Sequence, residues 1–343
     1  MLEQRPITGS NATLDAAPEA GPQQQQGSQY YDVPIRAFVT MVASAALLIG
    51  VAGNALVVAV VLRVRSRLLT PTNCYLVSLA ASDLLVLLLG SVTILVELNV
   101  VRDNWLLLGV PGCKLNVYLT YVAVKTSAFA ITAFSIERYV AICRPMRAHA
   151  LCTVRRAKRI ICAIWLCGLA YNSPWLYLAT LVPVRRLNDT VSACGHRLNR
   201  TDPGYAALYV GDLLLSYLAP LVLLSVLYTA VARVLFRSSA PSAESGQPMR
   251  PLRTFNTARS LRSRAQVVKM LFVVVVMFAI LWLPYRLMVA YNSFVPPQYR
   301  IVSEWYRVIS RLLVLVNSAI NPVIYNAMSV KFRREFRSLL YWI

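Results

Sequence analysis

Charged residues, and acidic residues most of all, are scarce in this chain. They make up 14% of the 343 residues, whereas 57% are hydrophobic; an ordinary soluble protein is about 25% charged. Only 14 residues are Asp or Glu against 35 Lys and Arg, so the net charge is +21. The basic residues gather in short runs between long apolar stretches, which is typical of membrane loops and not of a nucleic-acid-binding face. The composition therefore excludes a soluble fold and a nucleic-acid partner.

Histidine is rarer still, with two residues in the whole chain, and no Cys/His spacing of the zinc-binding kind occurs. No nucleophile and base stand in an arrangement typical of an enzyme. No cleavable signal peptide is recognisable, because residues 1–34 are polar and rich in Gln, Pro and Gly. We therefore predict no enzymatic activity, no metal cofactor beyond the sodium ion considered below, and a disordered tail over 1–34.

Long apolar stretches are what the chain has in abundance. A bilayer is crossed by roughly 20 helical residues, and stretches of that length cover 35–63, 73–98, 115–142, 158–181, 206–236, 267–294 and 303–326. They predict an all-α membrane protein, a seven-transmembrane helix bundle.

The basic runs orient this bundle. They follow the first, third, fifth and seventh apolar stretches, and the positive-inside rule places these segments in the cytoplasm. The N-terminus is then extracellular, and the chain is a multi-pass protein of the plasma membrane. Three glycosylation sequons fall on the predicted outer side, at Asn11, Asn188 and Asn199.

Two cytoplasmic segments complete the expected domain organisation of a transmembrane domain over 35–326. Residues 238–261 are rich in Ser, Pro, Arg and Gly, which predicts a flexible loop. Within 327–343, the apolar side chains share one helical face and the cations the other. This pattern predicts a short amphipathic eighth helix along the inner leaflet, followed by a short tail.

Polar side chains at mid-membrane depth are candidate functional residues, because each costs free energy there. Asp83 lies deep within the second stretch. Uncharged polar residues lie near the same depth on other stretches, namely Asn54, Ser127, Asn317, Ser318 and Asn321. Two interpretations stay open: a hydrated cluster that holds a small cation, and an ordinary interhelical hydrogen-bond network.

Cations and aromatic residues gather in the outer half of the bundle. Tyr121 and Lys125 are four residues apart and share a helical face, and Trp282 and Tyr285 share another. With Arg286 and Arg311 they predict an amphipathic ligand cavity. The alternative for either arginine is a side chain that extends to the outer interface.

Lys125 does not fit that alternative, because it lies 12 residues beyond Cys113 and therefore roughly 18 Å deeper along the helix. It needs a partner, and the candidates are Glu97, a backbone carbonyl, or an acidic group of the ligand. At the cytoplasmic end of the same helix, Glu137 and Arg138 form a charge pair that can act as a latch between two helix arrangements.

Taken together, these residues resemble the rhodopsin-like (class A) G protein-coupled receptors. The motifs that carry the resemblance span nearly all of 35–341 and are Gly53-Asn54, Leu79–Asp83, Glu137-Arg138-Tyr139, Trp165, Pro220 with Tyr228, Trp282-Leu283-Pro284, and Asn321–Tyr325.

The resemblance implies a role for each group. Arg138 is held by Glu137 at rest and then meets the G protein, while a set of switch residues rearranges: Tyr139, Tyr228, Asn321, Pro322 and Tyr325. Asp83, Ser127, Asn317, Ser318 and Asn321 form a sodium site. Cys113 and Cys194, both on the outer side, form a disulfide. The other five cysteines are expected to be free. The implied partners are an extracellular ligand, a heterotrimeric G protein, membrane lipids and arrestin.

Within this family the chain is most similar to the thyrotropin-releasing hormone receptor subgroup, over Ile131–Tyr139, Leu281–Arg286, Asn292–Phe294 and Asn317–Asn326. This implies a small-neuropeptide receptor that signals through Gq and calcium. Two departures stand out, since Lys125 replaces Asn and Leu315 replaces Tyr of that subgroup. The alternatives are a receptor for a different peptide or an acidic small ligand, and an orphan or constitutively active receptor. A retinal photoreceptor is excluded because the seventh stretch has no lysine for a Schiff base.

Overall fold

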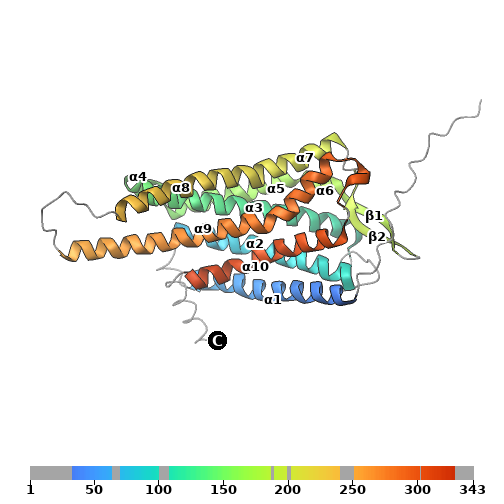
Figure 1. Ribbon diagram of the computed structural model, residues 1–343, viewed down its shortest axis with the longest axis horizontal. Helices are drawn as coiled ribbons and strands as arrows, with labels where there is room; N and C mark the ends of the chain where they lie inside the picture. The colour runs from blue at the N-terminus through green and yellow to red at the C-terminus, as the bar shows by residue number, and fades with distance from the viewer. Residues whose placement is uncertain are drawn as a thin grey trace, which may run out of the picture.

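The computed structural model describes residues 33–63, 70–99, 108–186, 189–198, 202–239, 251–301 and 303–328. Long helices run side by side along one axis, and a small hairpin lies at one end (Figure 1). The long helices are α1 Val33–Arg63, α2 Pro71–Asn99, α3 Gly109–Cys143, α5 Val154–Asn172, α8 Ala219–Ser239, α9 Pro251–Phe294 and α10 Glu304–Met328. The shorter elements are α4 Pro145–Leu151, α6 Pro174–Leu178, α7 Pro203–Leu213, the π-helical turn η2 Leu214–Leu218, the 3₁₀ turn η3 Pro297–Tyr299, β1 Ala179–Arg186 and β2 Asp189–His196.

The seven predicted membrane spans are confirmed. Seven helical stretches among the described residues are long and apolar enough to cross a bilayer. The fourth joins α5 to α6 and the fifth joins α7 to α8. Most boundaries differ by a few residues. Helix α3 begins at Gly109 and not at residue 115, and α9 begins at Pro251, well before residue 267.

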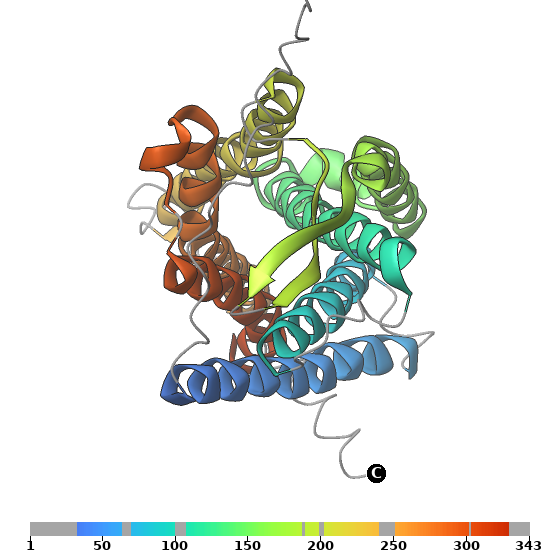
Figure 2. The ribbon, with the colours of Figure 1, turned by 90° about the vertical axis from the view of Figure 1, so that its right-hand side faces the viewer.

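The expectation of a purely helical chain is corrected by a two-stranded antiparallel sheet. Strands β1 and β2 pair with Leu181 opposite Cys194, in a segment that sequence analysis treated only as an outer loop. The fourth helical stretch ends earlier than predicted, because α6 stops at Leu178 and Ala179 begins β1. Viewed from this end, the hairpin lies across the middle of a ring of helices (Figure 2). We call this the hairpin end of the bundle and the opposite end, where α3 finishes, the Arg138 end.

A disulfide between Cys113 and Cys194 fixes the hairpin to the start of α3, so the predicted pairing is confirmed. The two Cα atoms are 5.5 Å apart, within the range that such bonds require. The remaining five cysteines are free, as expected.

The segment expected to be a flexible loop over 238–261 is helical at both of its described ends. Helix α8 continues to Ser239, and α9 already begins at Pro251, where proline's fixed φ suits the first turn of a helix. Residues 240–250 lie outside the described residues, as do the three sequon asparagines and the predicted amphipathic helix beyond Met328. Of the predicted disordered tail over 1–34, residues 1–32 also lie outside the described residues, whereas Val33 and Pro34 already belong to α1.

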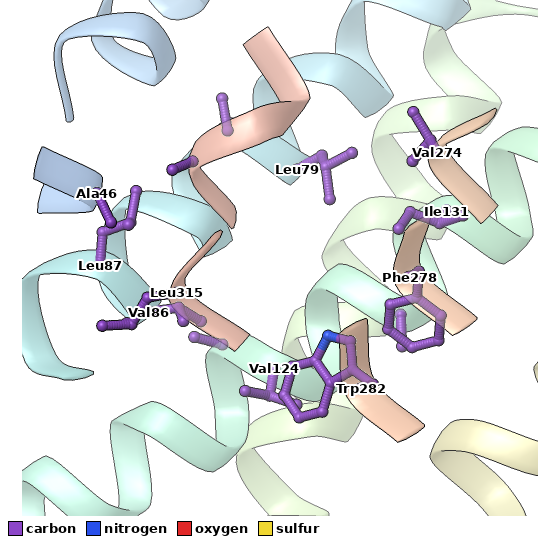
Figure 3. Close-up of a cluster of buried hydrophobic side chains, with 14 of the residues drawn as sticks. Ala46, Leu79, Val86, Leu87, Val124, Ile131, Val274, Phe278, Trp282 and Leu315 are labelled. Atoms are coloured by element: carbon purple, nitrogen blue, oxygen red, sulfur yellow. The ribbon is translucent and has the colours of Figure 1, made fainter. Parts of the chain in front are cut away.

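Helix α3 is the central element of the bundle. In its most apolar window 61% of the residues are buried, against 17% for the α5–α6 span. Trp282 and Phe278 of α9 pack beside Val124 and Ile131 of α3, and Leu315 of α10 joins the same core (Figure 3). Lipid offers no hydrophobic drive for helices to associate, so close packing of this kind stabilises the bundle.

The contact of α1 with α2 and α10 depends on Gly50. A Cβ atom there would stand 2.5 Å from Leu87 Cδ1 and 3.0 Å from Ala319 Cβ. We expect Gly50→Ala to destabilise the protein by about 1–3 kcal/mol, because overpacking forces neighbouring side chains to move. The thermal unfolding of the purified protein measures this. Gly211→Ala is the matched control, since its nearest atom would be 3.5 Å away; equal unfolding temperatures for the two variants would contradict the prediction.

Candidate functional site

A buried cluster of three charged side chains lies midway along the bundle. Lys125 of α3 and Arg286 of α9 both bind the carboxylate of Asp212, which lies in α7. Lys125 Nζ is 3.0 Å from Asp212 Oδ1, and Arg286 Nη1 bonds to Asp212 Oδ2. None of the three side chains is more than 5% exposed. One carboxylate therefore lies between two cations, away from water.

Two polar residues, Asn172 and Ser216, also bond to these charged groups. We call the whole set the central charge cluster; its members are Lys125, Asp212, Arg286, Asn172 and Ser216. Lys125 Nζ donates to Asn172 Oδ1 of α5, and Ser216 Oγ donates to Asp212 Oδ1 at 2.8 Å. Ser216 belongs to the π-helical turn η2, and such turns are frequent at functional sites. The cluster thus joins the spans built on α3, α5, α7 and α9.

The partner of Lys125 is a residue that sequence analysis missed. Asp212 was not among the candidates, and Glu97 bonds instead to Arg311 at 2.6 Å. That pair is about one-third exposed. The signal for Asp212 was present, since it is a lone acid within an apolar stretch, as Asp83 is. Arg286 does not extend to an interface, so that alternative is wrong for this residue.

An aromatic cluster lies between the central charge cluster and the hairpin. Tyr121 stacks on Trp175 of α6 with ring centroids 4.3 Å apart. Its hydroxyl is 3.4 Å from that of Tyr209, which is 2.8 Å from the hydroxyl of Tyr205. Tyr285 of α9 packs against the same group. Of this cluster the sequence predicted Tyr121 and Tyr285 and missed Trp175, Tyr205 and Tyr209.

Trp282 connects these groups to the core. Its ring lies 5.3 Å from the guanidinium of Arg286 and is edge-on to Tyr285 at 6.2 Å. On its other side it contacts Phe278 at 5.9 Å, and Figure 3 shows it beside Val124. Its indole Nε1 is buried and has no hydrogen-bond partner among the described residues. The predicted ligand residues of α3 and α9 therefore lie together around Trp282.

At the Arg138 end, the expected charge pair is formed. Arg138 Nη2 donates to Glu137 Oε1 at 3.0 Å, and the arginine side chain is 21% exposed. Nearby, the hydroxyl of Tyr228 in α8 is 3.1 Å from Ser135 Oγ of α3. Tyr139 lies on the same helix and is half-buried. The contact between Tyr228 and Ser135 thus links α8 to α3 at this end, whereas the charge pair lies within α3.

Around Asp83, the predicted polar residues are buried together. Asn321 Nδ2 donates to Asp83 Oδ2 at 2.7 Å, whereas Asn54 bonds to the backbone carbonyls of Gly50 and Ser318. The other oxygen of Asp83, Oδ1, has no hydrogen-bond partner among the described residues. The remaining residues of the predicted sodium site, Ser127, Asn317 and Ser318, are also buried, as are the predicted switch residues Pro322 and Tyr325. A hydrogen-bond network is present, and the unpaired oxygen also suits a small cation.

Residues 53–325 match the family described as 7 transmembrane receptor (rhodopsin family). The chain belongs to this family. This rhodopsin-family receptor is 41% identical over 305 residues to the thyrotropin-releasing hormone receptor of Gallus gallus, covering 85% of this chain and 75% of that protein. The thyrotropin-releasing hormone receptor of Homo sapiens is 40% identical over 305 residues, which cover 85% of this chain and 75% of that protein. Neuromedin-U receptor 1 of Homo sapiens is 34% identical over 306 residues, with 85% and 70% covered. The resemblance read from the motifs is confirmed, and the receptor is not an enzyme.

Proposed function

We propose that this receptor binds a small neuropeptide at its hairpin end and activates a heterotrimeric G protein, of the calcium-mobilising Gq class, at its Arg138 end. The observation that carries the proposal is the group of aromatic and cationic side chains around Trp282. Relatives named for thyrotropin-releasing hormone and neuromedin-U support a peptide ligand. The receptor lies in the plasma membrane with its N-terminus outside, as the basic runs at the other end favour.

The proposed ligand-binding residues differ in exposure. Arg311, which is paired with Glu97, is about one-third exposed. Trp282, Lys125 and Arg286 are buried, and Tyr121 and Tyr285 pack into the aromatic cluster. Aromatic walls with few, placed polar groups are typical of small-ligand sites.

The switch residues lie along the path from this site to the G protein. Trp282 contacts Phe278, which packs into the core with Ile131 of α3. About two turns further along α3 than Ile131, Arg138 is held by Glu137. A ligand that displaces Trp282 shifts α9 against α3, with Pro284 inside α9 as the natural pivot. Tyr228, Asn321, Pro322 and Tyr325 then rearrange, and Arg138 becomes available to the G protein.

Asp83 takes part as the site of a sodium ion. Its unpaired Oδ1 supplies a negative ligand, and Ser127, Asn317, Ser318 and Asn321 supply oxygens at the same depth. When bound, the ion supplies only charge; the residues themselves hold α2, α3 and α10 together.

The test is a calcium assay in transfected cells against a neuropeptide library that includes thyrotropin-releasing hormone. Calcium release by one or more peptides, absent from untransfected cells, is expected. A receptor that responds to no peptide but raises calcium without any addition would instead be constitutively active, and the peptide proposal would fail.

We expect Lys125→Asn to change the rank order of active peptides and to shift the potency of the best one at least tenfold. The substitution removes one of two buried cations that share Asp212 and so changes the charge behind the ligand from positive to neutral. Dose–response curves for calcium release measure this. Unchanged order and potency would show that Lys125 does not select the ligand.

A further inference from the structure

The central charge cluster contains more hydrogen-bond donors than acceptors. Two cations share one carboxylate, so the cluster carries a net positive charge in a buried setting. The other acids whose contacts are described are engaged elsewhere. Asp83 bonds to Asn321, Glu97 to Arg311 and Glu137 to Arg138, and Asp202 accepts from the backbone N–H groups of Gly204 and Tyr205. A buried cation without full compensation is costly. Nothing in the described part of the chain supplies the missing negative charge.

The uncompensated donors lie on one face of α9. Arg286 uses Nη1 for Asp212 and Nη2 for Ser216, the latter at a long 3.4 Å. Its Nε has no hydrogen-bond partner among the described residues, and neither has Nε1 of Trp282. Both side chains are 5% exposed, and they are four residues apart with the guanidinium over the indole ring. The N–H groups of Arg286 Nε and Trp282 Nε1 are thus two buried donors, close together, without an acceptor among the described residues.

Lys125, in contrast to Arg286, already has hydrogen-bond acceptors within the cluster. Its ammonium group bonds to Asp212 and Asn172, and it faces the ring of Tyr171 at 4.3 Å. Arg286 instead presents the edge formed by Nε and Nη2, a fork that matches the two oxygens of a carboxylate. Lys125 contributes by occupying Asp212, which leaves the charge of Arg286 only partly balanced.

We propose that Arg286 and Trp282 form a subsite for a carboxylate group of the ligand. This deepens the proposed function, since it gives the chemical class of the ligand: a molecule with an anionic end that reaches the floor of the site. The carboxylate accepts from Arg286 Nε and Nη2 and from Trp282 Nε1, and it brings the cluster to neutrality. An amide in the same place offers one oxygen, no charge, and N–H groups that face other donors.

The experiment uses purified full-length receptor and two small probes that differ only in the group of interest. Sodium benzoate and benzamide are compared by thermal unfolding at equal concentration and ionic strength. Benzoate is expected to raise the unfolding temperature by about 2 °C or more, because a ligand that binds only the folded state stabilises it. Benzamide is expected to leave it unchanged. Equal shifts from the two probes, or no shift from benzoate, would overturn the proposal.

Variants assign the benzoate effect to the subsite. Arg286→Gln should abolish it, and Trp282→Phe, which keeps a ring but removes the N–H, should reduce it by at least half. Arg197→Gln is the matched control, because Arg197 also lies over an aromatic ring, that of Tyr177, but stands outside the bundle core. It should keep the full benzoate effect. A benzoate shift that persists in both Arg286→Gln and Trp282→Phe would rule out this subsite, and Trp282→Phe alone decides the matter if Arg286→Gln does not fold.

This test separates the inference from the proposed function. A benzoate effect together with a silent peptide library would keep the anion subsite and reject the peptide ligand. Active peptides without any benzoate effect would keep the peptide ligand and reject the subsite.

Discussion

Asp212→Asn is expected to destabilise this receptor by about 3–5 kcal/mol and to remove most of it from the cell surface. The carboxylate is the shared partner of Lys125 and Arg286, and all three side chains are buried. Without it, two cations face each other with no counter-charge. Removing one partner of a buried ion pair costs far more than the pair contributes, because the remaining charge stays buried and unpaired.

Surface expression and thermal unfolding measure this effect. The matched control is Glu97→Gln, which breaks the ion pair with Arg311 where both side chains are about one-third exposed; exposed pairs contribute about 0–1 kcal/mol. Adding Lys125→Asn to Asp212→Asn should restore part of the loss, since one cation then remains instead of two. If Asp212→Asn unfolds within about 1 kcal/mol of Glu97→Gln, the cluster does not stabilise the bundle as described.

Sequence reasoning predicted the bundle well because membrane burial leaves a strong signal. Long apolar stretches must be helical where no water can satisfy the backbone, so the seven spans were recognisable. The family motifs also led to the Cys113–Cys194 disulfide and to the Glu137–Arg138 pair, both of which are present. Each of these features could be predicted from a single motif or a single stretch of the sequence.

Asp212 shows where this reasoning reached its limit. A lone acid in an apolar stretch is visible in the sequence, but its partners come from α3 and α9. Which side chains meet depends on the rotation of each helix about its axis, and a π-helical turn within 214–218 changes that rotation in the fifth span. The sequence therefore left the partner of the Lys125 ammonium group undetermined, whereas in the structure Asp212 is that partner.

The hairpin escaped prediction for a different reason. Residues 179–196 contain a proline within β1, at Pro183, and proline inside a strand is a signal against one. A two-stranded sheet has only edges, and there a proline is tolerated. The disulfide at Cys194 fixes the hairpin to α3, and the ring of His196 in β2 packs against Trp175 and Tyr205 of the aromatic cluster. Neither contact is visible from local sequence.

Helix α3 unites the two ends of the molecule. Near the hairpin it carries Cys113, then Tyr121 and Lys125 at the proposed ligand site, and finally Glu137 and Arg138. Helix α3 packs against α2, α5, α8 and α9 and is the most enclosed of the described spans. We therefore expect a shift of α9 against α3 to change the contacts of Glu137 and Arg138 at the far end of α3. The central charge cluster and the Glu137–Arg138 pair are both formed in the present arrangement.

Arg138→Ala is expected to abolish calcium signalling while leaving surface expression and ligand binding in place. The side chain is partly exposed at the end of α3, and within the described part of the chain it pairs with its neighbour Glu137 at 3.0 Å. Its loss therefore removes no long-range contact of the bundle, but it removes the cation that we expect to meet the G protein. Ligand-stimulated calcium release, normalised to surface receptor, should fall at least tenfold.

Arg144→Ala is the matched control for this prediction, because Arg144 follows α3 directly and is exposed. It should signal like the unmodified receptor. Glu137→Gln tests the latch in the opposite direction: with the carboxylate neutral, Arg138 is released, and calcium signalling without ligand should rise. Full signalling by Arg138→Ala at normal surface levels would show that this arginine does not contact the G protein in the way the motif implies, and the coupling site would then have to lie elsewhere at the same end.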